Sequence, residues 1–208
     1  MELTQAKQFE IAEVQQWDRW YRANFINSIA GFRAACLVGT VNTQCIPNLS
    51  VFSQIVHLGA DPALVGLINR PRVATPHTLK NIEESGSFTL QHIPKTLLHK
   101  AHQTSAKYAD DVSEFSAVGL TPFYIPGIVA PFVKECSIAW AAQLVEIVPI
   151  THNNTFLIIG KIQTLLAPET CIQADGFVDI SQAESVASVG LDAYYEANLI
   201  ERIPYAKP

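Results

Sequence analysis

The chain has 208 residues, and 49% of them are apolar, which suffices for a hydrophobic core and argues against an intrinsically disordered protein. With 14 basic and 19 acidic residues the net charge is -5, and no lysine or arginine cluster is long enough to follow a nucleic-acid backbone. No apolar stretch approaches the length of a membrane span. We therefore expect no nucleic-acid partner, no membrane partner, a cytoplasmic location and one domain over residues 1–208.

The N-terminal third of the sequence predicts a helix followed by strands. Apolar residues recur near helical spacing from Glu13 to Ile29, and Gly31 is expected to end this amphipathic helix. Three β-rich runs follow, and the Asn/Thr and Gly-Ala-Asp-Pro segments between them are typical of turns in an antiparallel meander. The runs cover residues 34–41, 46–57 and 63–69.

The middle of the chain predicts short helices between strands. A helix is expected from Pro76 to Glu84, because proline suits the first helical position and Gly86 suits the residue after the helix. The further elements expected here are a strand over 88–93, a helix over 95–103, and a helical turn over 114–117 that Ser113 caps before Gly119.

The last third predicts a long hairpin and an extended tail. Apolar runs over 133–148 and 155–166 are joined by the turn Thr151-His-Asn-Asn154, and a short helix is expected over 181–187. The whole pattern predicts a mainly β fold of about six antiparallel strands with short peripheral helices, compatible with closure into a small barrel. Because the two hairpin arms carry more apolar surface than the helices can cover, we expect a homodimer.

The segment from Arg70 to Asn81 has the features of a phosphate-binding site. Thr75 precedes Pro76 at a predicted helix start, where a hydroxyl can accept from the first-turn amides. Those amides, the positive end of the helix dipole, the Thr78 hydroxyl and the Arg70 guanidinium would converge on one anion. The sequence lacks Gly-x-Gly-x-x-Gly, a Walker-type glycine loop and Gly-x-Ser-x-Gly, so the common dinucleotide, nucleoside-triphosphate and serine-hydrolase sites are not expected.

Cysteine and histidine positions do not predict a metal site. The four cysteines are widely scattered and contain no Cys-x-x-Cys pair, so we interpret them as buried and inert rather than as zinc or redox ligands. His99 and His102 could share a metal on one helix face, but a solvated face is the better interpretation, because Lys100 and Gln103 are their neighbours. The cysteines are Cys36, Cys45, Cys136 and Cys171.

Several motifs, taken in order, resemble the flavin reductase-like family of FMN-binding split-barrel proteins. No single motif is specific, but their order and spacing extend over most of the chain. They are Pro47-Asn-Leu-Ser-Val-Phe-Ser53, Arg70 through Asn81, Ser87-Phe-Thr-Leu-Gln-His-Ile93, Ser113-Glu-Phe-Ser-Ala-Val-Gly-Leu-Thr-Pro122, Ile158-Ile-Gly-Lys161, Gly190-Leu-Asp-Ala-Tyr-Tyr195 and Tyr205-Ala-Lys-Pro208.

The resemblance implies a split β-barrel with FMN bound between two motifs. Members commonly have an acidic residue before the threonine of the second motif, whereas this chain has His77, so the role of position 77 stays open. In this sequence the implied contacts to the isoalloxazine and ribityl chain are Asn48, Ser50, Val51, Phe52 and Ser53, and those around the phosphate are Arg70, Thr75, His77 and Thr78.

Simpler interpretations of the same residues stand beside this one. Ser50 and Ser53 could end a strand in a polar turn, and Arg70 could form a surface ion pair worth under about 1 kcal/mol. Four aromatic residues could stack on a flavin or a nicotinamide, although a buried aromatic more often belongs to the core. These are Phe52, Trp140, Tyr194 and Tyr205.

The function implied by the resemblance is an FMN-dependent oxidoreductase that accepts electrons from NADH or NADPH and passes them to a small molecule or free flavin. Because FMN itself carries such chemistry, the absence of a catalytic triad is no objection. Two alternatives remain: an FMN-holding electron carrier reduced by a protein partner, and a binding module for another phosphorylated ligand. The family also implies a homodimer with the flavin near the subunit boundary.

Overall fold

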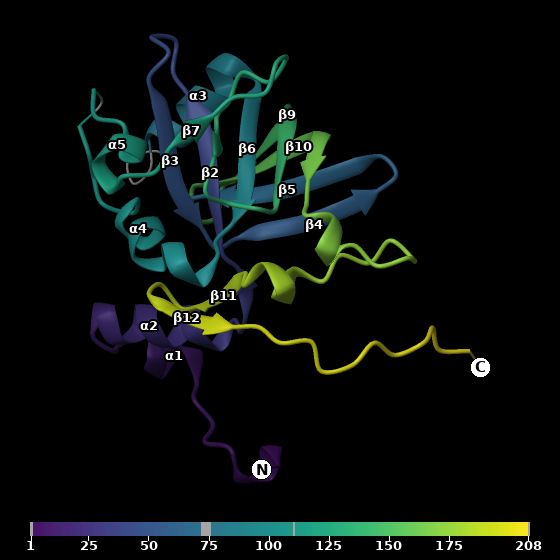
Figure 1. Ribbon diagram of the computed structural model, residues 1–208. Helices are drawn as coiled ribbons and strands as arrows, with labels where there is room; N and C mark the ends of the chain where they lie inside the picture. The colour runs from purple at the N-terminus through teal and green to yellow at the C-terminus, as the bar shows by residue number, and fades with distance from the viewer. Residues whose placement is uncertain (1, 72–75, 110, 208) are drawn as a thin grey trace.

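The protein is built around one curled, seven-stranded antiparallel sheet (Figure 1). The computed structural model describes residues 2–71, 76–109 and 111–207. From edge to edge the strands are β3 (Pro47–Phe52), β2 (Cys36–Val41), β6 (Ser87–His92), β9 (Ala139–Ile150), β10 (Thr155–Leu166), β5 (Ala63–Asn69) and β4 (Ile55–Ala60).

Two consecutive strands form opposite edges of this sheet. Only Ser53 and Gln54 separate the end of β3 from the start of β4, yet five strands lie between them in the sheet. So short a connection is possible only if the sheet curls until its two edges meet. The N–H of Ile68 on β5 donates to the Gln54 carbonyl at 2.9 Å, which fixes this corner to the far half of the sheet.

The interior of the curled sheet forms the first hydrophobic core. It contains Phe52, Phe88 and Ile158 from separate strands, and helix α3 (Pro76–Ser85) closes it with Leu79 and Ile82. All five side chains are buried. The helix therefore lies against the barrel through its apolar face, and its N-terminal turn is held at a fixed position beside β2 and β3.

A second core covers the outer face of β2 and β3. Leu37 and Leu49 point to this face, where they pack with Ile93 and with Phe115 of helix α5 (Glu114–Val118). Helix α4 (Leu98–Gln103) adds Ala101 to the same cluster. Both faces of β2 are thus covered, in agreement with the burial of all six of its residues.

A smaller three-stranded sheet lies below the main one (Figure 1). It joins the two ends of the chain, since β1 (Arg33–Ala34) pairs with β11 (Val186–Val189), which pairs with β12 (Ala193–Glu196). Helices α1 (Ile11–Val14) and α2 (Arg19–Ile29) lie beside this small sheet. Elsewhere, β7 (Pro122–Phe123) pairs with β8 (Phe132–Val133) in a separate two-stranded ladder.

The sequence predicts one continuous helix over residues 13–29, but the structure divides this region into α1 and α2. Asp18 lies outside the helical region and accepts hydrogen bonds from the N–H groups of Trp20, at 2.9 Å, and Tyr21, at 3.1 Å. Asp18 is therefore an N-cap, and a new helix begins at Arg19. Its carboxylate satisfies first-turn amides that have no carbonyl partner within the helix. Helix α2 has no fully buried residue: Phe25 is half-buried against Phe9 and Trp17, and the other large apolar side chains are exposed.

Three predicted strand and helix boundaries also differ. The run 46–57 is two strands separated by the Ser53–Gln54 corner, and the run 133–148 is divided between β8 and β9. The helix expected over 181–187 is replaced by a 3-10 turn over Ile180–Ala183 and by β11. Glu184 has a left-handed backbone (φ 52°), which ends the turn and lets the chain enter the small sheet.

Other sequence predictions are confirmed. The helix starting at Pro76 ends at Ser85, and Gly86 follows it with φ 67°. The β9–β10 hairpin has the predicted turn, the region 95–103 is helical, and the protein is mainly β. Ser113 precedes α5 as expected, but its side chain does not cap the helix. In the described ranges no helix is both long and apolar enough to cross a bilayer.

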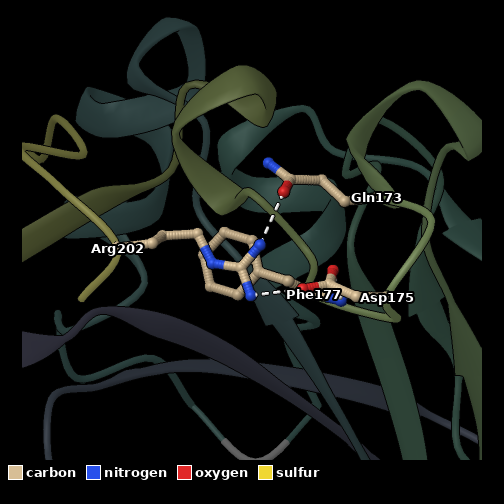
Figure 2. Close-up of polar contacts among 4 residues, drawn as sticks. All are labelled: Gln173, Asp175, Phe177 and Arg202. Carbon is tan, nitrogen blue, oxygen red and sulfur yellow. Dashed lines mark hydrogen bonds and ion pairs between the residues drawn. The ribbon is translucent and has the colours of Figure 1, made fainter. Parts of the chain in front are cut away.

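Beyond β12 the chain forms an extended C-terminal arm, residues 197–207, that runs away from the body (Figure 1). Arg202 attaches it to the turn near residue 175. Its guanidinium donates to Gln173 at 2.8 Å and to Asp175, and it lies 4.3 Å from the centroid of the Phe177 ring (Figure 2). The arm is otherwise strongly exposed, and Ile200 and Tyr205 keep 99% and 92% of their surface.

Candidate functional site

A buried polar network connects β2, β3 and the first turns of α3. The Asn48 amide donates to Thr40 Oγ1 at 3.2 Å and to Thr78 Oγ1 at 3.3 Å. Thr78 Oγ1 in turn donates to Ser50 Oγ at 3.2 Å, and the Asn81 amide donates to Thr40 Oγ1 at 3.1 Å. Polar side chains are retained inside a fold at such density only when they satisfy one another. The network therefore brings Asn48, Ser50 and Thr78 together, as the sequence predicted.

Strand alternation gives β3 two different functional surfaces. Asn48, Ser50 and Phe52 point toward the barrel and α3, whereas Leu49 and Val51 pack on the outer core. The backbone groups also alternate, and those of Pro47, Leu49 and Val51 point away from β2 along the outer edge of the sheet. We refer to this side of residues 47–53 as the outer edge of β3.

The dipeptide before and at the start of α5 occupies the first part of that edge. Ser113 Oγ donates to the Pro47 carbonyl at 2.5 Å, and Glu114 Oε2 accepts the Leu49 N–H at 3.0 Å. These two bonds replace the ones that a neighbouring strand would make. They also end at Leu49, so the outward N–H and C=O of Val51 lie beyond the region that Ser113 and Glu114 cover.

Glu114 is an unusual carboxylate, because only 5% of it is exposed. Burial raises its pKa above the ordinary 4.5, while the Leu49 N–H and the charge of His77 oppose that rise. His77 belongs to the first turn of α3, so the influence of its charge places the carboxylate within electrostatic reach of the predicted phosphate-binding turn.

A cavity of about 140 Å³ opens beside the polar network. Its walls come from the β2–β3 hairpin, from one face of α3 and from Val112, and they combine amide, imidazole and ammonium groups with apolar side chains in similar measure. The amide and ammonium groups of this mixed lining can bind an anion. The lining residues are Asn42, Ile46, Pro47, Asn48, His77, Lys80, Asn81 and Val112.

Ser53 and Arg70 lie at the opposite end of β3 from the cavity, where Ser53 follows β3 and Arg70 follows β5. Ser53 is half-buried at the corner after β3, and Arg70 is exposed directly after β5. The bond from Ile68 to Gln54 holds the end of β5 next to that corner. Both residues are thus near the seam where the sheet edges meet. Thr75, also predicted here, lies outside the described residues.

Residues 32–175 match the sequence profile of the flavin reductase like domain. The chain belongs to this family. A crystal structure from Shewanella frigidimarina, assigned provisionally as a flavin reductase with a split barrel domain, is 41% identical and covers 97% of this chain and all of its own, with a TM-score of 0.93. The predicted family and split-barrel fold are therefore confirmed.

More distant solved structures share the fold. Nitrilotriacetate monooxygenase component B from Bacillus cereus is 18% identical with a TM-score of 0.82, and the match covers 91% of this chain and 96% of that one. Flavoredoxin from Desulfovibrio vulgaris is 22% identical with a TM-score of 0.74, and the match covers 84% and 92%. At these identities the likeness concerns the fold of flavin reductase-like proteins.

The four aromatic candidates for stacking are dispersed in this flavin reductase-like domain. Phe52 is buried in the first core, and Trp140 packs beside it at 5.4 Å from the His92 ring. Tyr194 contacts His102 with its hydroxyl at 3.0 Å, while Tyr205 is on the exposed arm. The side chains of Phe52 and Trp140 therefore pack in the first hydrophobic core.

The cysteines are all free thiols, and the prediction that all are buried is wrong for Cys45, which is exposed, and only partly right for Cys136, which is half-buried. Cys45 is exposed because it lies in the β2–β3 turn with a left-handed backbone (φ 62°). Cys36 and Cys136 fit the prediction of inert thiols, since burial raises the pKa of each to about 12. Cys171 is buried.

Sequence reasoning missed three residues of the site. Thr40 and Asn81 complete the polar network, and Glu114 holds the outer edge of β3. Asn81 had a usable signal, because it lies one helical turn after Thr78 on the same helix face. Thr40 and Glu114 had none, since their contacts depend on strand pairing and on the packing of α5.

Replacing Glu114 by Gln should change how stability depends on pH. Because the folded-state pKa of Glu114 is raised, the wild type loses stability relative to Glu114→Gln as pH rises from below 4.5 through that raised pKa. Urea unfolding of both proteins at several pH values between 4 and about 8 measures the difference.

Glu135 provides the matched control with the opposite sign. Burial is the largest single influence and raises the pKa of Glu135, but the hydrogen bonds from Thr121 and the charge of Lys100 together lower it overall. Glu135→Gln should therefore lose stability relative to the wild type as pH rises. A pH-independent difference for Glu114→Gln would show that its carboxyl pKa is not raised in the folded state.

Proposed function

We propose that this chain binds one FMN and acts as an oxidoreductase that takes electrons from NADH or NADPH and delivers them to a small molecule or free flavin. The observation that carries the proposal is the convergence of three elements at one seam: the outer edge of β3, the end of β5 and the N-terminal turn of α3. The proposed FMN contacts are Asn48, Ser50, Val51, Phe52, Ser53, Arg70, Thr75, His77 and Thr78.

The proposed phosphate position is the start of α3. The helix is ten residues long, so its dipole and its first-turn amides favour an anion there. The ammonium group of Lys80 in the neighbouring cavity supplies a positive charge, and the exposed Arg70 guanidinium can form a charge-assisted hydrogen bond. Thr78 uses its hydroxyl within the polar network, which supports a role in holding the turn in place.

The proposed position of the ring is the outer edge of β3 beyond Leu49. An isoalloxazine carries alternating acceptors and a donor along its pyrimidine edge, and an outward-facing strand edge offers the complementary alternation of N–H and C=O. Val51 provides such a pair, and Ser53 adds a hydroxyl at the corner. The half-buried Ser50 lies between the two proposed positions, at the level of the ribityl chain.

In this proposal FMN carries out the chemistry, and the protein binds and orients it. Bound FMN would supply hydride acceptance and electron transfer. The chain's residues bind the phosphate, orient the ring edge and keep water from the inner face through the packed core behind Phe52. No acid–base pair is required of the protein, and the site offers hydrogen-bonding groups in its place.

The second candidate is an electron carrier that holds FMN and is reduced by a protein partner. The similarity to a flavoredoxin supports it, whereas the similarity to a provisionally assigned flavin reductase and to a monooxygenase component supports an oxidoreductase. The oxidoreductase is preferred because the relative with 41% identity is of that kind. The cytoplasmic location and the single domain remain predictions.

The protein should bind about one FMN per chain, and more tightly than riboflavin, because the phosphate contributes to affinity. Arg70→Ala should reduce that preference by about 1.5–3 kcal/mol, the contribution of a charge-assisted hydrogen bond. Isothermal titration calorimetry with both flavins measures it. Arg19→Ala, which removes an exposed arginine on α2, is the matched control and should bind like the wild type.

Equal affinities for FMN and riboflavin in the wild type would contradict the proposed phosphate site. No binding of either flavin, together with binding of another phosphorylated compound, would support the third interpretation, a module for a different phosphate ligand.

Anaerobic addition of NADH or NADPH should bleach the bound flavin on the order of seconds or faster, as expected for an enzyme with ordinary turnover. Stopped-flow absorbance in the flavin bands measures this. A flat trace with both nucleotides, in a sample that dithionite does reduce, would favour the electron carrier.

We also propose that the protein is a homodimer. Helix α2 exposes Trp20, Tyr21 and Ile29, and the arm exposes Ile200 and Ile203. An aromatic side chain can bury roughly 150–250 Å², so covering these surfaces on two copies reaches the standard interface size of about 800 Å² per partner. The sequence argument placed the interface on the β9–β10 hairpin, whose Val145 and Leu165 are also exposed, so this hairpin is a second candidate surface beside α2 and the arm.

Replacing Ile200 and Ile203 together by Asp should weaken the dimer, because charges at an apolar contact must be desolvated. Sedimentation velocity over a range of concentrations measures it, and Asn198→Asp adds a charge at a polar position of the same arm as the control. A wild type that stays monomeric with saturating FMN would contradict the dimer.

A further inference from the structure

We propose that Glu114 is a positioning residue for the ligand: it fixes the outer edge of β3 in the extended form that receives the ring. The inference rests on the proposed function, because it concerns how the same site is held in shape. Glu114 contributes no contact of its own to the proposed ligand. It acts through Leu49, which lies between Asn48 and Ser50.

The geometry of β3 makes such support necessary. β3 is an edge strand, so only β2 fixes it by a ladder of hydrogen bonds. Edge strands bend and slip more easily than central ones, and a slip of one residue would exchange the faces of Asn48 and Leu49. The network side chains would then point into the outer core. Something on the other side must therefore hold the register, and Ser113 and Glu114 are the residues that bond there.

The choice of a carboxylate is informative. A buried glutamate is costly, since burial penalises its charged form. A glutamine could accept the same N–H without that cost, so stability alone does not explain the residue. A charged acceptor forms a shorter and stronger bond to a backbone amide than a neutral one does. The residue is thus explained by a requirement for rigidity at Leu49.

The second partner of the carboxylate supports the same inference. His77 interacts electrostatically with Glu114, and it belongs to the first turn of α3. The direct contact of the carboxylate is the Leu49 N–H of β3, at 3.0 Å. Ser113, its neighbour in the sequence, donates to the Pro47 carbonyl on the same edge. Two adjacent residues therefore hold β3 on both sides of Asn48.

The test compares Glu114→Ala and Glu114→Gln with the wild type. Glu114→Ala should weaken FMN and riboflavin binding equally, each by about tenfold, because the bond it removes orders the edge that both rings use. Their ratio, which reports the phosphate, should stay near the wild-type value. Glu114→Gln should restore part of the affinity, since its amide oxygen can accept the Leu49 N–H but forms a weaker bond than a carboxylate does.

Amide hydrogen exchange at Leu49 in the ligand-free proteins provides the independent readout. It should be fastest in Glu114→Ala and intermediate between that variant and the wild type in Glu114→Gln. Glu135→Ala, which removes a carboxylate that accepts the Thr121 N–H outside the site, is the control and should bind flavins like the wild type.

Three outcomes distinguish the positioning role of Glu114 from the proposed function. Wild-type affinity in Glu114→Ala, with faster exchange at Leu49, would overturn the positioning role and leave the proposed function intact. Failure of the wild type to bind any flavin would overturn the proposed function and the positioning role with it. A fall in affinity for FMN alone would also contradict the inference, because it would assign Glu114 to the phosphate and not to the ring edge.

Discussion

The short connection between β3 and β4 constrains the rest of this structure. Only two residues separate strands that form opposite edges of a seven-stranded sheet, and the sheet must curl until those edges meet. Curling creates the closed interior that Phe52, Phe88 and Ile158 fill. It also creates a seam, and both motifs that the sequence indicated approach this seam, because the first leads into the connection and the second follows β5, whose Ile68 N–H donates to the Gln54 carbonyl at the corner.

The seam explains how polar groups can be buried here with their hydrogen bonds satisfied. Edges of a sheet carry backbone groups without strand partners, and the protein satisfies those near Pro47 and Leu49 with Ser113 and Glu114. The side chains of Thr40, Asn48, Thr78 and Asn81 satisfy one another on the inner side. The part of β3 beyond Leu49 is therefore an edge already held straight, which is the condition for binding a planar ligand with little loss of entropy.

Much of the fold and part of the site could be predicted from the sequence. The α3 helix was predictable because Pro76 and Gly86 mark its ends, and the β9–β10 hairpin because its turn residues stand between two apolar runs. The helix predicted over 181–187 failed because small and β-branched residues there pair with Arg33 and Ala34, far away in the sequence. Glu114 could not be predicted, since nothing in its neighbourhood reports a contact with Leu49 65 residues away.

The central claim is that the two motifs form one site, with phosphate at the start of α3 and the ring along β3. A crystal structure of the protein grown with FMN tests it most directly. The account predicts the phosphorus atom within hydrogen-bonding range of the first-turn amides of α3, and the pyrimidine edge of the ring against the backbone of Val51. Flavin density elsewhere on the molecule, or a ring that does not touch β3, would contradict it.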